Sequence, residues 1–232
     1  MNLQYFIFDL DNTLYAKKTG MLKYIDKRID NFMKKKLNLP LEKVTELRVE
    51  YWRKYGTTLG GMIRQHQTDP QEYIENVYSI NIKDFIRPDP RLQVMLSKIN
   101  CRKIIFSNSP VEYIGEVLKV LGVAEFFEKI YDIRFCNYIG KPNLASYQQV
   151  LGDLKVNPEK CLFIDDALVN VQAAQTVGME TVWLTTEPSI KQCRWWSREI
   201  YQLPEIITKL SLKQFAVADL PFSSRISIEL LN

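Results

Sequence analysis

Residues 5–15 read YFIFDLDNTLY, an apolar run that ends in two aspartates one residue apart, Asp9 and Asp11. A short, continuous apolar run rich in aromatic and β-branched residues is typical of a strand buried on both faces of a parallel sheet. Two carboxylates this close repel each other, and burial raises the cost of charging them. We therefore expect a cation, or a chemical role, at the end of this strand.

The second half of the chain alternates strand and helix patterns. Further strand-like segments are KIIFSN (103–108), IYDIRF (130–135), CLFID (161–165) and TVWL (181–184). Apolar residues at helical spacing separate them, and two of these helices are expected to end at Gly122 and Gly178. This alternation predicts an α/β fold with a parallel sheet covered by helices on both faces.

Residues 16–87 show only helical spacing, as in Leu22, Ile25 and Ile29. The sequence therefore predicts a catalytic core of residues 1–15 and 88–188, with an all-helical cap domain of residues 16–87 inserted after the first strand. Residues 189–232 are expected to form a C-terminal extension that is partly helical. Within it, KQCRWWSREI (191–200) and LPEIITKL (203–210) each predict a short helix, and the remainder fits no element.

Composition narrows the class of protein. The chain has 232 residues, 46% of them hydrophobic, which is enough for one large core. Its net charge of +4 comes with local lysine runs that indicate solvated helix faces, so we expect no nucleic-acid partner. No apolar stretch approaches the roughly 20 residues of a membrane span, and no signal peptide is evident. We therefore expect a cytoplasmic protein with no membrane partner.

Two residue types restrict the chemistry. The four cysteines contain no C-x-x-C pair, which fits reduced thiols in a cytosol. His66 is the only histidine, so a metal site built from several histidines is excluded.

Polar side chains gather where the expected strands end. Ligands of open parallel sheets bind outside the carboxyl ends of the strands. The residues at those ends are Asp9, Asp11, Thr13, Ser107, Asn108, Asp165 and Asp166, and Lys141 lies on a nearby loop. Each has a structural explanation when taken alone, such as a turn, a helix cap or a surface charge. Four acidic groups at one edge, however, need a hard cation, and oxygen ligands favour Mg²⁺.

A magnesium ion, a lysine and a hydroxyl at the end of a strand form a site for a dianion such as phosphate. One aspartate of the first pair is then available to attack phosphorus, and its neighbour to move protons.

Four segments resemble the motifs of the haloacid dehalogenase (HAD) superfamily, in the order of that superfamily. They are FDLDNTLY (8–15), which fits D-x-D-x-T after an apolar strand, FSNS (106–109), GKP (140–142) and FIDDALVN (163–170). The resemblance implies a Rossmann-like core with a small, all-helical C1-type cap inserted after the first strand.

The resemblance also implies roles for individual residues. Asp9 would be the nucleophile that forms an aspartyl-phosphate. Asp11 would protonate the leaving oxygen and then activate water. Mg²⁺ would be held by Asp9, the backbone carbonyl of Asp11 and Asp166, with Asp165 acting directly or through water.

Ser107, Lys141 and the backbone of Asn108 would bind the phosphoryl group. Thr13 would orient the first loop. Asn170 stands where many relatives carry a further acid, so a third acidic contribution there is in doubt.

Within the inserted helices, YWRKYGTTLGGM (51–62) is similar to a segment of the pyrimidine 5′-nucleotidase-like subfamily. The candidate substrate-recognition residues in this cap are Tyr55, Thr57, Thr58 and Arg64.

We therefore predict a magnesium-dependent phosphomonoesterase that acts on a small phosphorylated metabolite, with a pyrimidine nucleoside 5′-monophosphate as the leading substrate. One alternative is a phosphatase for sugar phosphates or other small phosphometabolites. Another is a catalytically silent binding protein, although the motif set is complete. Dehalogenation is disfavoured, because dehalogenases of the superfamily lack an acid at the position of Asp11.

Overall fold

The structure is a computed structural model that describes residues 3–188 and 192–218. Within these ranges, six parallel strands form one sheet in the order β3-β2-β1-β4-β5-β6. The strands are β1 (Tyr5–Phe8), β2 (Arg102–Phe106), β3 (Lys129–Tyr131), β4 (Cys161–Asp165), β5 (Glu180–Leu184) and β6 (Trp196–Ser197). The prediction of a parallel α/β sheet is confirmed.

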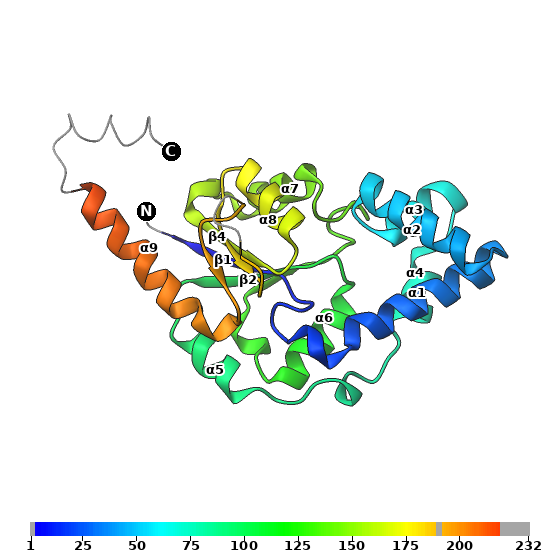
Figure 1. Ribbon diagram of the computed structural model, residues 1–232, viewed down its shortest axis with the longest axis horizontal. Helices are drawn as coiled ribbons and strands as arrows, with labels where there is room; N and C mark the ends of the chain where they lie inside the picture. The colour runs from blue at the N-terminus through cyan, green and yellow to red at the C-terminus, as the bar shows by residue number, and fades with distance from the viewer. Residues whose placement is uncertain (1–2, 189–191, 219–232) are drawn as a thin grey trace.

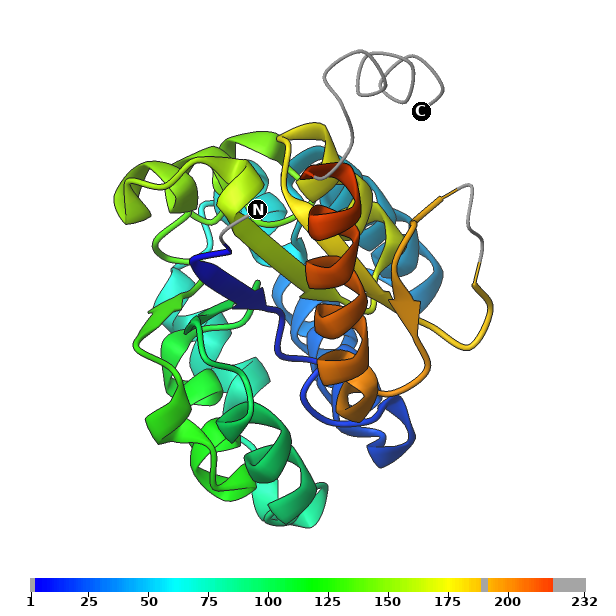
Figure 2. The same cartoon turned by 90° about the vertical axis from the view of Figure 1, so that its left-hand side faces the viewer.

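Helices cover both faces of this sheet (Figure 1). They are α5 (Pro90–Ser97), α6 (Val111–Leu121), α7 (Leu144–Leu154), α8 (Leu168–Thr176) and α9 (Leu203–Ala218). Alternate residues of β1 point to opposite faces. Phe6 and Phe8 pack in the cluster that contains α5, α6 and α9, whereas Tyr5 and Ile7 pack with α7 and α8. Figure 2 shows α9 running along its face of the sheet. The apolar run of β1 thus contributes to two hydrophobic clusters, one on each face of the sheet.

Four helices lie beyond the carboxyl ends of the strands (Figure 1, blue to cyan). They are α1 (Met21–Leu37), α2 (Leu41–Tyr55), α3 (Thr58–His66) and α4 (Pro70–Tyr78). The chain also contains the short 3₁₀ helices η1 (Lys17–Thr19), η2 (Ile82–Asp84), η3 (Ala124–Phe126), η4 (Pro158–Lys160) and η5 (Ile200–Gln202). We refer to residues 16–87 as the helical insertion, and its outer boundaries stay a prediction.

Two expected elements differ in the structure. Residues 191–200 were expected to form a helix, but residues 196 and 197 form β6, because the backbone N–H of Trp183 pairs with the carbonyl of Trp195 at the open edge of β5. The strand expected over 130–135 ends at Tyr131. The Asp132 side chain accepts the backbone N–H groups of Val111 and Phe135, which turns the chain.

The expected helix at 203–210 is present, and α9 continues to Ala218, into the segment that fitted no pattern. The predicted extension beyond residue 218 lies outside the described residues. No helix in the described part of the chain is long and apolar enough to cross a membrane.

Leu162 tests the packing of the sheet on its helices. Its side chain is fully buried in the same cluster as α5, α6 and α9. Leu162→Ala is expected to lower the free energy of unfolding by about 2–5 kcal/mol, because it leaves a cavity in a close-packed core. Chemical denaturation measures this loss. Val94→Ala, on the exposed side of α5, is the control, and a similar loss in both variants would contradict the assigned core.

Candidate active site

The site begins where β1, β2 and β4 end side by side. Phe8 is in register with Ile105 of β2 and with Ile164 of β4. The Asp9 N–H donates to the Ile164 carbonyl over 2.9 Å, so the pairing continues one residue beyond β1. This register brings Asp9 beside Asp165, the last residue of β4. The predicted meeting of polar residues at one edge of the sheet is therefore found.

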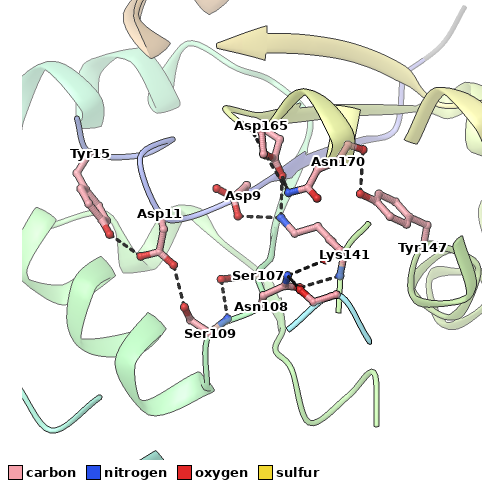
Figure 3. A network of polar contacts seen from close by, with 12 residues as sticks. Asp9, Asp11, Tyr15, Ser107, Asn108, Ser109, Lys141, Tyr147, Asp165 and Asn170 are labelled. Atoms are coloured by element: carbon pink, nitrogen blue, oxygen red, sulfur yellow. Dashed lines mark hydrogen bonds and ion pairs between the residues drawn. The ribbon is translucent and has the colours of Figure 1, made fainter. Parts of the chain in front are cut away.

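Lys141 lies between these two carboxylates (Figure 3). Its Nζ is 2.8 Å from Oδ1 of Asp9 and 2.8 Å from Oδ2 of Asp165, and its side chain is only 1% exposed. Burial opposes its charge, but the two carboxylates raise the pKa of Lys141 above its ordinary value. Lys141 is therefore a fixed cation in direct contact with the predicted nucleophile.

The Asn108 side chain holds the loop that carries Lys141. Its Oδ1 accepts the backbone N–H of Lys141 over 2.8 Å, and its Nδ2 donates to the Lys141 carbonyl over 2.9 Å. Nδ2 also lies 3.4 Å from the carbonyl oxygen of Gly56, in the helical insertion. From sequence only the Asn108 backbone was expected to act, so this side-chain role was missed.

Asp9, Asp165 and Asp166 form an acidic cluster whose carboxylate oxygens lie within 4.8 Å of one another. Burial, followed by the charges of Asp9 and Asp165, raises the pKa of Asp166 to about 7. Burial also raises the pKa of Asp165 to about 6, against the pull of Lys141. Three such carboxylates beside one lysine suit a divalent cation with oxygen ligands.

The two aspartates of the fourth motif differ in their surroundings. Asp165 is saturated, since its oxygens accept from Lys141, the Ala167 N–H and the Asn170 amide at 2.8–3.1 Å. Asp166 accepts a hydrogen bond from Asn12. Asp166 is therefore the more available metal ligand, and Asp165 mainly orients Lys141. Asn170, named from sequence as a supporting residue, supports Asp165.

Ser107 and Thr13 are both buried. Oγ of Ser107 accepts the backbone N–H of Ser109 over 3.1 Å, which leaves the Ser107 hydroxyl proton free to donate to a ligand. The Thr13 hydroxyl is buried and has no hydrogen-bond partner within the described ranges.

Asp11 is held by three hydroxyl groups. Tyr15 and Tyr113 both donate to its Oδ1, and Ser109 donates to its Oδ2 over 2.8 Å. Burial and then the charge of Asp9 raise the pKa of Asp11, and the three donors moderate this rise. Sequence reasoning missed all three. Tyr15 and Ser109 lay inside the quoted motifs, whereas nothing in the sequence marked Tyr113.

Three of the four candidate recognition residues contact the core or their own insertion. The Tyr55 carbonyl accepts the Gly140 N–H, the Thr57 hydroxyl caps α3 by accepting the Gly60 N–H, and Arg64 donates to the Asn137 carbonyl. Thr58 is the first residue of α3. Their predicted role in substrate recognition stays a prediction.

Gly56 allows the insertion to approach the Lys141 loop. Its φ of 74° is left-handed, and a Cβ at this position would lie 2.2 Å from the Gly140 carbonyl oxygen. Backbone therefore meets backbone at this joint. Gly61 lets α3 pack on the ring of Tyr51, since a Cβ at this position would lie 2.0 Å from Cγ of Tyr51.

A cavity of about 500 Å³ opens beside Asn12 and Asp166. Four cationic residues line it, namely Lys17, Lys18, Arg91 and Arg198, together with the acidic Glu199. Arg91 pairs with Glu199, whereas Lys17, Lys18 and Arg198 form no ion pair in the part of the chain that the structure describes. The cavity therefore has a net positive lining next to the acidic cluster.

The arrangement of Asp9, Asp11, Lys141 and the acidic cluster agrees with a match of the sequence to a family model. Residues 3–178 match the family model described as haloacid dehalogenase-like hydrolase. The chain belongs to this family. Its HAD fold, inferred from four short motifs, is thereby confirmed, and membership of a hydrolase family disfavours the catalytically silent alternative.

Two curated relatives are named for phosphate chemistry. Phosphate metabolism protein 8 of Saccharomyces cerevisiae is 28% identical over 198 residues, which span 75% of this chain and 59% of the yeast protein. Phosphoglycolate phosphatase of Yersinia pseudotuberculosis is 23% identical over 194 residues, 77% of this chain and 79% of the relative. Such names support a phosphatase, and they do not confirm the resemblance to pyrimidine 5′-nucleotidases.

A solved HAD phosphatase from Thermococcus onnurineus has the same fold, with a TM-score of 0.56 and 19% identity over 88% of this chain and 98% of that one. L-2-haloacid dehalogenases are also among the structural neighbours. The fold alone therefore does not choose between the two reactions.

The acidic cluster predicts a pH-dependent metal affinity. Asp166, with a pKa raised to about 7, and Asp165, at about 6, are protonated at low pH, where protons compete with a cation. We expect the Kd of the metal-free protein for Mg²⁺ to rise at least about tenfold between about pH 8 and about pH 5.5. Isothermal titration calorimetry measures this change.

Asp166→Asn should weaken binding at the higher pH and remove most of the pH dependence. Glu116→Gln, on the exposed side of α6, is the matched control. An unchanged Kd across the pH range would contradict a metal site at this cluster.

Proposed function

We propose that this protein is a magnesium-dependent phosphomonoesterase that transfers a phosphoryl group first to Asp9 and then to water. The geometry of Asp9 carries this proposal. One of its carboxylate oxygens pairs with Lys141, and the other has no hydrogen-bond donor in the described part of the chain. A carboxylate fixed through one oxygen and open at the other is suited to nucleophilic attack.

The surroundings of Asp9 suit a phosphoryl dianion. Lys141 supplies a buried positive charge, and the Ser107 hydroxyl has a proton to donate. Backbone N–H groups near Asn108 complete the set of donors. Donors fixed in a buried site stabilise the charge on transferring phosphoryl oxygens without having to reorganise.

Asp11 supplies the proton chemistry of the proposal. As the bond from phosphorus to the leaving oxygen breaks, the Asp11 carboxyl gives its proton to that oxygen. The resulting carboxylate then takes a proton from the water that attacks the aspartyl-phosphate, which returns Asp9 and releases phosphate. Because phosphate ester hydrolysis needs an acid at this position, the presence of Asp11 favours it over dehalogenation.

The acidic cluster and the Asp11 carbonyl would hold Mg²⁺, with Asp9 and Asp166 as carboxylate ligands. The bound ion would neutralise charge on the phosphoryl oxygens.

All four cysteines are free thiols, which supports the predicted cytoplasmic location.

The leading substrate is a pyrimidine nucleoside 5′-monophosphate, and the segment 51–62 of the helical insertion supports it. The cationic cavity favours a second candidate, a small phosphomonoester that carries another anionic group. Phosphoglycolate, which has a carboxylate, is the substrate in the name of one relative. Lys18 and Arg198 could pair with that second anion.

Asp9→Asn is expected to abolish phosphate release, because an amide cannot form the aspartyl-phosphate. Asp11→Asn should lower turnover at least about 100-fold on alkyl phosphates, and less on p-nitrophenyl phosphate, whose leaving group needs no proton. A phosphate-release assay with Mg²⁺ or with EDTA measures both. Retained activity in Asp9→Asn would refute the nucleophile.

A panel of UMP, CMP, sugar phosphates and phosphoglycolate separates the substrate candidates. Release favouring UMP and CMP supports the nucleotidase. If phosphoglycolate leads, the variant Lys18→Ala/Arg198→Ala should raise its KM at least about tenfold, since it loses two ion pairs, and leave p-nitrophenyl phosphate unchanged. Lys119→Ala, on the exposed side of α6, is the control.

A further inference from the structure

The carboxyl group of Asp11 is enclosed by a cluster of hydroxyl groups that the catalytic scheme does not use. We call Tyr15, Ser109 and Tyr113 the hydroxyl cluster. Figure 3 shows Tyr15 and Ser109 turned toward opposite sides of Asp11. The Tyr113 hydroxyl is 2.8 Å from Oδ1 of Asp11 and 3.1 Å from the Tyr15 hydroxyl. Within the described residues, every hydrogen-bond donor to this carboxyl group is therefore a neutral hydroxyl.

The three donors come from three separate segments. Tyr15 follows β1, Ser109 follows β2, and Tyr113 lies in the first turn of α6. Tyr15 is 6% exposed and Tyr113 is 3% exposed, so neither ring is free to move aside. Two donors on one oxygen and one on the other fix the rotation of the carboxyl group about its Cβ–Cγ bond.

The cluster also touches the helical insertion. The ring of Tyr78, the last residue of α4, packs against the ring of Tyr113 with centroids 5.2 Å apart. The position of Tyr113 is therefore set from both sides, by α6 of the core and by α4 of the insertion.

We propose that Tyr15 and Tyr113 are positioning residues that hold the Asp11 carboxyl group in the orientation needed for proton transfer. This inference rests on the proposed function, in which Asp11 protonates the leaving oxygen. Both tyrosines keep their own protons throughout, so the only proton that moves passes from Asp11 to the leaving oxygen and later from water to Asp11. Misplacing a catalytic group by about 1 Å can cost about 100-fold in rate.

A purely structural role would give a different result. A buried tyrosine hydroxyl needs a partner, and Asp11 could serve only to satisfy it. In that case the loss of a hydroxyl would lower stability but would not depend on the leaving group of the substrate. The dependence on leaving group is therefore the decisive measurement.

The test compares Tyr15→Phe, Tyr113→Phe and the double variant with the unsubstituted protein, using p-nitrophenyl phosphate and an alkyl phosphate. We expect kcat on the alkyl phosphate to fall about tenfold in each single variant and further in the double variant, because less of the acid is correctly oriented. The fall on p-nitrophenyl phosphate should stay below about threefold, with KM within about twofold for both substrates.

Tyr131→Phe is the matched control. Tyr131 is fully buried in β3, and its hydroxyl donates to Asp153 over 2.6 Å, so the variant loses a tyrosine–aspartate hydrogen bond that does not involve Asp11. It should lower the melting temperature without changing the ratio of the two kcat values.

Equal losses on both substrates, or a change in stability alone, would overturn the positioning role. Asp11→Asn separates this failure from failure of the proposed function. If Asp11→Asn shows the leaving-group dependence and the tyrosine variants do not, only the positioning role fails. If Asp11→Asn shows none, or the unsubstituted protein releases no phosphate, both fail.

Discussion

The buried contact of Lys141 with Asp9 and Asp165 is the constraint on which the rest of the site depends. Charged groups taken out of water are costly unless they are paired and hydrogen-bonded, and removing one partner of such a set leaves an uncompensated charge. Asp9 and Asp165 meet only because β1 and β4 are neighbours in register, and Lys141 reaches them only from the loop clamped by Asn108. The strand order, the Lys141 loop and the helical insertion thus all contribute to the position of the Lys141 ammonium group.

The contact with Lys141 gives the four carboxyl groups of the site different electrostatic surroundings. Asp9 and Asp165 share a cation supplied by the protein, whereas Asp166 forms no ion pair with a lysine in the described part of the chain. The carboxyl group of Asp11 pairs with no cationic side chain among the described residues and accepts from three hydroxyl groups. The four carboxyl groups that follow β1 and β4 therefore lie in three different electrostatic environments. Such differences in environment allow chemically identical groups to act as nucleophile, acid and ligand.

The sequence was sufficient for the parts of the structure that obey a periodic or topological rule. The run before Asp9 and the alternation after residue 88 predicted the parallel sheet, and the rule for strand ends gathered Asp9, Ser107 and Asp165 correctly. Tyr113 could not be found this way, because its helical spacing marks it only as a core residue. Strand β6 was missed since two residues of edge pairing leave no pattern. The clamp by the Asn108 side chain depends on a loop conformation that spacing does not encode.

At the joint between the helical insertion and the Lys141 loop, the main chain of Gly56 lies against the main chain of Gly140 and Lys141. A joint of this kind places few demands on the side chains around it. Under the proposed function, surface residues of the insertion can therefore vary, and with them the compound that is selected, while the residues proposed to handle the phosphoryl group stay fixed. Glycine is needed at positions 56, 60 and 140, because a Cβ at any of them would lie 2.2–2.4 Å from a neighbouring atom. Under the proposed function, the residues that select the compound and the residues that carry out the chemistry thus belong to separate parts of one polypeptide.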